Sequence, residues 1–403
     1  MTSVCFYFQV HQPLRLRPYS FFDVATADNY FDEEQNRYIL EKVSEKCYLP
    51  TNKLLLRLIR AHKGKFKLAF SISGILLDQL CLYRPDVLDS FIELGNTGCV
   101  EFLSETYAHS LAFVFSKDEF VRQVKKQNEC VNRYFNQLPT VFRNTELIYR
   151  NDLADTIHTM GFKGALCEGV DRILMGRSSN FLYQDENRKI KLLLKNYRLS
   201  DDVSFRFSDK NWKEFPLTAD KFASWIHSSA EKCDILNLFM DYETFGEHQW
   251  DSTGIFKFLQ ALPDQVLKNH KFRFSTPSEI ISNYTPQDIY SVPDYTSWAD
   301  TERDLSAWTG NSIQAEALRR VYSLEKMVHE VADSDVLSLF ENLQTSDHFY
   351  YMSTKFWQDG DVHKYFSPYN SPYDAYVYFS NVLSDFEQRL ANRKKLQLFQ
   401  NSY

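Results

Sequence analysis

The stretch Ile235-Leu-Asn-Leu-Phe-Met-Asp-Tyr-Glu-Thr-Phe-Gly-Glu-His-Gln-Trp250 begins as an apolar run that stops abruptly at an acidic residue, Asp241. An apolar run that does not alternate with polar residues is typical of a strand buried on both faces, as in a parallel sheet. An acid that ends such a run is costly to desolvate, which raises the pKa of its carboxyl and suits a proton donor. The stretch therefore predicts a buried strand with a candidate catalytic acid at its end.

Similar apolar runs recur along the chain, each beside a polar cluster, and helical patterns lie between them. Ser116-Lys-Asp-Glu119 is a capping-box sequence at the start of one such helix, and Gly161 is a suitable cap at the end of another. Strand alternating with helix about seven times predicts an α/β fold, either a parallel β/α barrel or a doubly wound sheet, with the chemistry where the strands end. The other predicted strands are Val4–Val10, Phe66–Ile72, Cys99–Leu103, Val141-Phe142, Gly164–Cys167 and Leu199–Phe205 around Asp201 and Asp202.

Beyond about residue 290 the pattern becomes helical. Ile313–Val331 carries Leu318, Val321, Leu324 and Val328 at helical spacing, and residues 376–390 show the same periodicity. We therefore predict two domains, a catalytic β/α barrel over residues 1–290 and a helical module over residues 291–403.

Composition and charge exclude several classes of protein. A net charge of −7 argues against a surface that binds nucleic acid or anionic lipid. The sequence has no run of about 18 apolar residues and no signal pattern at its N-terminus, so we expect a cytoplasmic protein. The seven scattered cysteines predict neither a disulfide framework nor a zinc ribbon, and most should be small core residues. The aromatic content of 16% fits either a large core or a cleft that stacks sugars.

Glu146, in Phe142-Arg-Asn-Thr-Glu-Leu-Ile-Tyr149, is a second candidate for chemistry. Hydrolysis of a glycosidic bond needs two carboxyls that flank it, one ionised and one protonated. Arg143 could keep Glu146 ionised, although on a strand the two would face opposite sides. The alternative is that Glu146 and Asp241 each cap a helix or pair with a surface base.

Five segments follow one another along the chain: His11-Gln12-Pro13, Gly98–Leu111, Phe142–Asp152, Met240–Trp250 and Ser306–Gln314. Together they resemble the signature regions of glycoside hydrolase family 57, most closely those of its α-amylase group. The resemblance implies an incomplete seven-stranded β/α barrel, followed by helices that close one side of the cleft, and a retaining mechanism that requires no metal and no cofactor. It implies Glu146 as nucleophile, Asp241 as general acid/base, and an α-1,4-glucan or maltooligosaccharide as substrate.

The resemblance also implies a set of substrate-binding residues within these segments. His11 could instead be a buried core histidine, and Trp308 could instead anchor the core of the helical module. Gln9 occupies the position two before His11, where several transferases of the family have a second histidine, and this favours the amylase group. The implied substrate-binding residues are His11, Glu101, Glu105, His109, His248, Trp250 and Trp308.

Three other functions stay open at this point. A 4-α-glucanotransferase of the same family would share the covalent intermediate, and a non-catalytic amylase-like protein would bind glucan without turnover. A metal-dependent hydrolase or deacetylase would need clustered ligands, but none of the ten histidines lies four residues from another. The sequence does not determine the oligomeric state.

Overall fold

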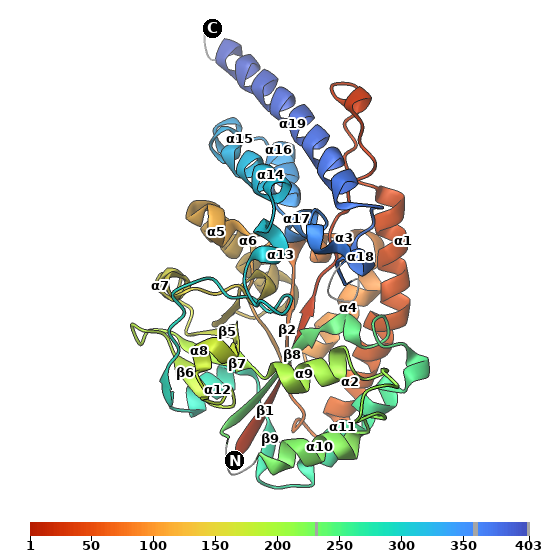
Figure 1. The fold of residues 1–403 in the computed structure, drawn as a ribbon, viewed down its shortest axis with the longest axis vertical. Coiled ribbons are helices and arrows are strands. Elements are labelled where there is room, and N and C mark those ends of the chain that lie inside the picture. The colour runs from red at the N-terminus through yellow and green to blue at the C-terminus, as the bar shows by residue number, and fades with distance from the viewer. Residues whose placement is uncertain (230–232, 358–361, 401–403) are drawn as a thin grey trace. The chain divides into compact units, whose positions relative to one another are not determined.

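The computed structural model of the chain describes residues 1–229, 233–357 and 362–400. It has an α/β fold that combines parallel sheets with many helices (Figure 1). The chain divides into two compact units. The first comprises Met1–His11, Ile39–Glu105 and Lys126–Trp298, and the second comprises Gln12–Tyr38, Thr106–Lys125 and Ala299–Tyr403.

One sheet of the first unit is built around β1 (Thr2–Val10), every residue of which is buried. β1 pairs in parallel with β2 (Leu68–Ile72), β8 (Ile235–Asp241) and β9 (Phe272–Phe274), and β2 pairs in parallel with β3 (Val100–Phe102). Because all neighbours of β1 are parallel to it, the carboxyl ends of these strands lie at one edge of the sheet. The apolar runs that form β1, β2 and β8 are therefore buried parallel strands, as predicted.

The second sheet of this unit holds β4 (Val141–Arg143), β5 (Gly164–Glu168) and β7 (Lys191–Lys195) in parallel order. β6 (Leu182–Gln184) pairs with β7 in the antiparallel sense, and β10 (Asp288–Ile289) extends the sheet beyond β6. The two sheets are joined at two places. A parallel bridge connects Ser104, just after β3, to Phe142 of β4. Asn237 of β8 accepts a hydrogen bond from the backbone of Asn196, just after β7, at 2.9 Å.

A single core cluster contains side chains from both sheets. Tyr7 of β1, Leu166 of β5 and Phe239 of β8 belong to it, together with Leu147, which follows Glu146. Both predicted catalytic segments thus place a neighbouring apolar side chain in the same core. Burial of these side chains, each worth about 1.5–3 kcal/mol, fixes the positions of the strand ends.

The helices of the first unit follow the strands in sequence. α2 packs against α4 and α11, and α10 packs against α11 (Figure 1). The division into units passes through α1 (Glu33–Val43) and α6 (Lys117–Phe135). The remaining helices of this unit are α2 (Leu49–Ala61), α3 (Gly74–Tyr83), α4 (Pro85–Gly95), α7 (Asn151–Thr159), α8 (Asp171–Leu174), α9 (Tyr197–Ser204), α10 (Ala219–Ser228), α11 (Ile255–Leu267) and α12 (Pro277–Asn283).

One predicted strand was wrong. The run Leu199–Phe205 lies largely in helix α9, and the strand of this region is β7, a few residues earlier. Asn196 caps the helix by accepting a hydrogen bond from the backbone of Leu199, and Leu199 and Val203 are four residues apart, as one face of a helix requires. Asp201 and Asp202, which the sequence prediction placed in a strand, lie inside this helix.

The second unit is helical. α19 packs against α14 and α15 (Figure 1). The helix predicted over Ile313–Val331 is two helices that meet at Leu324. The helices of this unit are α5 (Ala112–Phe115), α13 (Ser306–Thr309), α14 (Ser312–Ser323), α15 (Glu325–Val331), α16 (Ser334–Leu343), α17 (Ser346–Tyr350), α18 (Val362–Phe366) and α19 (Pro372–Gln400).

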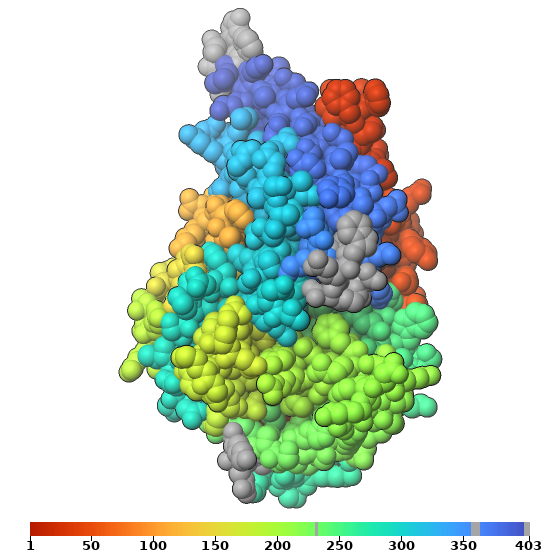
Figure 2. All heavy atoms as spheres, viewed as in Figure 1, coloured from red at the N-terminus to blue at the C-terminus, as the bar shows by residue number. Residues whose placement is uncertain are grey.

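Two earlier segments of the chain complete the second unit, which the predicted module of residues 291–403 did not include. Asp385 of α19 accepts hydrogen bonds from the backbone of Ala25, at 2.5 Å, and from the hydroxyl of Tyr30. In Figure 2 this early segment, in deep red, lies beside the blue C-terminal helix. Ser110 likewise forms an antiparallel bridge with Thr345. These pairs join residues more than 200 positions apart, so local sequence patterns could not reveal them.

The sequence analysis also made predictions about the cysteines and about membrane-spanning segments. All seven cysteines are free, and six are buried while Cys81 is exposed. Over the part of the chain that the structure describes, no helix combines the length and the apolar character that a membrane span requires.

Candidate active site

Polar residues occupy the carboxyl ends of the parallel strands in the first unit. Asp241 ends β8, Arg143 ends β4, Glu168 ends β5 and Lys195 ends β7. Gln9, the penultimate residue of β1, lies beside Asp241 in the strand register. Chemistry in parallel α/β folds gathers at these ends, so this edge is the candidate active site.

A buried hydrogen-bond network surrounds the amide of Gln9. The hydroxyls of Tyr7 and Ser71 each donate to Gln9 Oε1 at 2.8 Å, and Gln9 Nε2 donates to Glu105 Oε1 at 3.1 Å. Glu105 is fully buried. The network holds Glu105 near the end of β1. The Glu105 carboxylate therefore lies at the same edge of the sheet as Asp241.

The pKa of the Tyr7 hydroxyl depends on the charged side chains around this network. Burial raises the pKa of this hydroxyl well above the usual value, the charge of Arg143 opposes that rise, and the charges of Glu105 and Asp241 add to it. Two carboxylates and one guanidinium thus lie close enough to influence a single side chain inside the sheet.

Glu146 lies in a short 3₁₀ turn, Thr145–Leu147, with an unusual backbone conformation. Its φ is 56° and that of Leu147 is 52°, both in the left-handed region. Left-handed residues other than glycine cost on the order of 1–3 kcal/mol each and occur most often at functional sites. The buried side chain of Leu147 holds this conformation in place.

Trp298 binds Glu146 through two hydrogen bonds. The indole Nε1 donates to Glu146 Oε2 at 2.6 Å, and the backbone N of Trp298 donates to Glu146 O at 3.1 Å. Nearby, Tyr149 and Thr296 form an antiparallel bridge with backbone hydrogen bonds of 3.0 and 2.9 Å. The segment 296–298 therefore runs alongside the segment that carries Glu146.

Two cations face the indole ring of Trp298. The Arg143 guanidinium carbon lies 4.9 Å from the ring centroid and the Lys195 ammonium lies 5.1 Å from it. Arg143 is fully buried, and its three nitrogens have no hydrogen-bond partner among the described residues. Lys195 pairs with Asp201 at 3.2 Å and Glu168 at 3.8 Å. Arg143 thus faces the same indole that donates a hydrogen bond to Glu146.

His11 follows β1 and is partly exposed. Its Nδ1 lies 2.7 Å from the hydroxyl of Ser73, the residue that precedes α3. Since the ring is not enclosed in the core, the core alternative for His11 is disfavoured.

The loop after β8 carries His248 and Trp250. Burial lowers the pKa of His248 to about 4, so the imidazole is neutral at physiological pH. Trp250 is 61% exposed, with the ammonium of Lys46 5.2 Å from its ring centroid. An exposed indole of this kind is available for stacking on a sugar.

Glu243 and Glu247 in this loop make structural contacts. The hydroxyl of Tyr48 donates to Glu243 at 2.5 Å, and Lys42 donates to Glu247 at 2.5 Å. These contacts favour a structural role for both carboxylates.

Glu101 has a structural partner. Its carboxylate accepts a hydrogen bond from the backbone N of Ser278 at 2.9 Å, in the first turn of α12. Burial raises the pKa of this carboxyl. The contact satisfies a backbone donor that a helix N-terminus leaves unpaired.

His109 and Trp308 belong to the second unit. His109 is buried, has a φ of 51°, and accepts a backbone hydrogen bond from Ser346 at 3.0 Å. Trp308 is 1% exposed and its ring centroid lies 6.2 Å from that of Tyr350. The burial of Trp308 favours the core anchor among the two roles considered for it.

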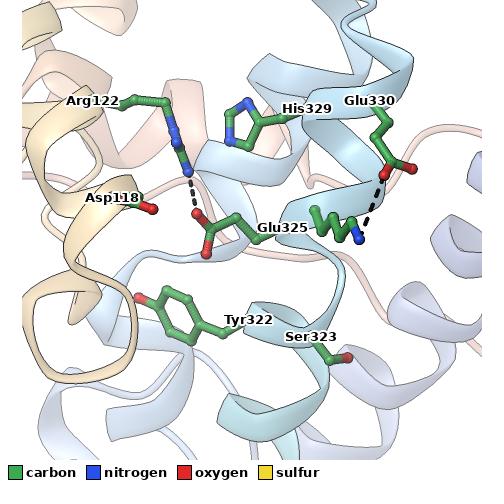
Figure 3. A pocket seen from close by; sticks show the side chains of 8 residues that line it. Asp118, Arg122, Tyr322, Ser323, Glu325, His329 and Glu330 are labelled. Carbon is green, nitrogen blue, oxygen red and sulfur yellow. Dashed lines mark hydrogen bonds and ion pairs between the residues drawn. The ribbon is translucent and has the colours of Figure 1, made fainter.

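The second unit also has a surface pocket of about 560 Å³ beside a group of potential metal ligands (Figure 3). Within the described residues, Glu119, Glu325 and His329 have ligand atoms within 4.8 Å of one another. Arg122 reaches into the group, binding Glu119 at 2.9 Å and also Glu325, and His329 Nε2 lies 3.1 Å from Glu119. Since a guanidinium already compensates both carboxylates, the group acts as an ion-pair network between α6 and α15.

Sequence reasoning missed Trp298 and Lys195 entirely. Trp298 lies eight residues before the last signature segment, in a stretch with no periodicity. Its role depends on the bridge between Tyr149 and Thr296, a pairing across 147 residues. Lys195 was hidden because the strand of its region was misplaced.

Comparisons with known proteins show the family of the chain. The model of glycosyl hydrolase family 57 matches residues 5–293. A putative α-amylase of Methanocaldococcus jannaschii is 41% identical over 396 residues, which cover 95% of this chain and 84% of that protein. The chain therefore belongs to glycosyl hydrolase family 57.

Solved structures share the fold at low identity. A branching enzyme of the family from Pyrococcus horikoshii superposes with a TM-score of 0.69 at 16% identity, over 91% of this chain and 87% of that one. An α-amylase from Thermotoga maritima superposes with a TM-score of 0.63 at 13% identity, over 97% and 94%. The fold is therefore common to proteins with different named activities.

Proposed function

We propose that this chain is a retaining hydrolase of α-1,4-glucans, of the α-amylase type, with Glu146 as nucleophile and Asp241 as general acid/base. The observation that carries the proposal is the gathering of these segments at the strand ends: Asp241 lies beside Gln9, and Glu146 is held by Trp298, which in turn packs against Arg143. The named activity of the Methanocaldococcus jannaschii relative supports the same substrate class.

Each carboxylate has surroundings that suit its proposed role. Glu146 accepts a hydrogen bond from the indole N–H of Trp298, whose ring two cations face, and a hydrogen bond to the charged carboxylate favours the ionised form that a nucleophile needs. Asp241 ends a strand of buried apolar residues, which favours the protonated form of an acid catalyst. In a retaining mechanism Asp241 protonates the leaving oxygen while Glu146 attacks the anomeric carbon, and Asp241 then takes a proton from water as the glycosyl ester is hydrolysed.

We further propose that β1, β2, β3, β4, β5, β7 and β8 form the incomplete seven-stranded barrel that the resemblance implies. The bridge from Ser104 to Phe142 and the contact of Asn196 with Asn237 support this, because they join the two sheets at both ends of the strand order. Such a barrel would bring all seven carboxyl ends to one rim.

For sugar contact we retain His11, Glu105, His248 and Trp250 from the sequence prediction, and His109 stays a prediction from the resemblance. Trp250 has the most exposed ring of these and is the proposed stacking platform. Glu101 and Trp308 are assigned structural roles because of their contacts with Ser278 and Tyr350.

The division of labour is tested with Asp241→Asn. On aryl maltosides with good leaving groups, which need little protonation, the variant should retain much more activity than on maltooligosaccharides. Glu146→Gln should lose activity on both. Equal losses in both variants on every substrate would refute the assignment of roles.

Hydrolysis and glucanotransfer differ only in whether water or a sugar hydroxyl attacks the intermediate. Incubation with one maltooligosaccharide and analysis of product lengths separates them. Products shorter than the substrate support hydrolysis, whereas longer products would show transfer. Binding without any product would show a non-catalytic glucan-binding protein.

A further inference from the structure

We infer that Trp298 is a positioning residue for Glu146, whose indole N–H holds the carboxylate ionised and oriented for attack. The inference rests on the proposed function, in which Glu146 is the nucleophile. Trp298 lies outside the signature segments that the sequence resemblance used.

The inference is supported by two hydrogen bonds that Trp298 donates to Glu146. The side chain of Trp298 donates to Glu146 Oε2 at 2.6 Å while its backbone donates to Glu146 O at 3.1 Å. The two bonds fix both the carboxylate and the backbone that carries it. Since Glu146 and Leu147 adopt left-handed conformations, which are strained, an external contact of this kind is needed to keep the turn in one arrangement.

The charges around Trp298 strengthen its role as donor. Arg143 and Lys195 lie 4.9 and 5.1 Å from its ring centroid. A cation beside an indole ring draws electron density from it, which makes the N–H a better donor to an anion. Arg143 is fully buried, so water and salt screen its interaction with the ring only weakly.

The chemical consequence concerns ionisation. A hydrogen bond to the charged form of a carboxyl lowers its pKa. Removing the indole N–H should therefore raise the pKa of Glu146 and leave less of the ionised nucleophile at acidic pH. The acid limb of kcat/KM reports this group in the free enzyme.

The test is Trp298→Phe, which keeps an aromatic ring in the core but lacks the N–H. We expect the acid limb of kcat/KM to move upward by about one to two pH units, with a loss of about tenfold to a hundredfold on the acid side, the range that one hydrogen bond to a charged group supplies. The matched control is Trp225→Phe on α10, because that indole also faces a lysine, Lys221, at 5.6 Å. The control should leave the acid limb in place.

A second variant tests the same hydrogen bond with a side chain that keeps the shape of tryptophan, so a folding defect cannot explain the result. Benzothienylalanine at position 298 replaces the indole N–H by sulfur with almost no change of shape, so its acid limb should move as in Trp298→Phe. An acid limb that coincides with wild type in this variant would overturn the inference. Glu146→Gln is assayed beside it: if that variant stays active, the proposed function itself fails, whereas an inactive Glu146→Gln with an unmoved limb refutes only the role of Trp298.

Discussion

The two tryptophans of the signature segments should respond to truncation in opposite ways. Trp308 is 1% exposed and lies near Tyr350, whereas Trp250 is 61% exposed beside Lys46. A buried Trp removes about 150–250 Å² from water, which at about 25 cal/mol per Å² corresponds to about 4–6 kcal/mol. Measured truncations of large aromatic residues cost about 3–5 kcal/mol, so we expect Trp308→Ala to lose about that much free energy of unfolding.

Trp250→Ala should leave the free energy of unfolding almost unchanged, because most of its ring already contacts water. Its effect should fall on glucan affinity, with a loss of about 1–3 kcal/mol if stacking on a sugar resembles stacking of bases on aromatic rings. Urea denaturation measures the first quantity and calorimetric titration with maltoheptaose measures the second. A Trp308→Ala variant of normal stability with weakened binding would refute the reasoning and return Trp308 to the substrate-binding set.

Three further predictions concern pH, metal and truncation. The pKa of His248 is near 6.5 in the unfolded state and about 4 in the folded state, so the unfolded state takes up this proton first as pH falls. The free energy of unfolding should therefore decrease by at most about 3 kcal/mol between these two pH values. His248→Asn should flatten that part of the stability profile. Activity should survive EDTA. The His329→Gln variant should keep the activity of the wild type, because Arg122 already compensates the charge of Glu119. Loss of activity in EDTA would contradict this expectation. A fragment of residues 1–290 should be inactive and aggregate, because residues 12–38 and 106–125 lose the helices that complete their unit; a soluble, active fragment would show that the later helices are dispensable.

The strands that bear the signature segments could be predicted because their sequences are unambiguous. Val4–Val10 and Ile235–Met240 are apolar apart from Gln9 and Asn237, and both lie in buried strands. Gly161 was expected to end a helix and has a φ of 93°, which glycine adopts without strain. In these cases local preference and tertiary structure agree.

The sequence failed where capping or long-range pairing decides the structure. The strand predicted at Leu199–Phe205 lies largely in a helix, because Asn196 caps a helix there. The capping box at Ser116 formed only in part: Ser116 Oγ accepts from the backbone of Glu119 at 3.2 Å, while the Glu119 carboxylate accepts from Gln123 and Arg122. A side chain with several possible partners cannot be assigned from spacing alone.

The candidate site shows the same limit. Asp241 could be identified from its own strand, but the neighbours that give Glu146 its chemistry could not. Trp298 reaches Glu146 across 152 residues, and its contact depends on the path of the chain after β10. Sequence therefore predicts which carboxylates are candidates, while the structure shows what surrounds them.

The most direct test of the central proposal is the rescue of Glu146→Ala by azide, followed by NMR of the sugar product. If Glu146 is the nucleophile of a retaining enzyme, the variant should be inactive on an activated α-maltoside, azide should restore turnover, and the product should be the β-glycosyl azide, of inverted configuration. Full activity of Glu146→Ala without azide, or rescue that gives the α-azide, would contradict the proposal.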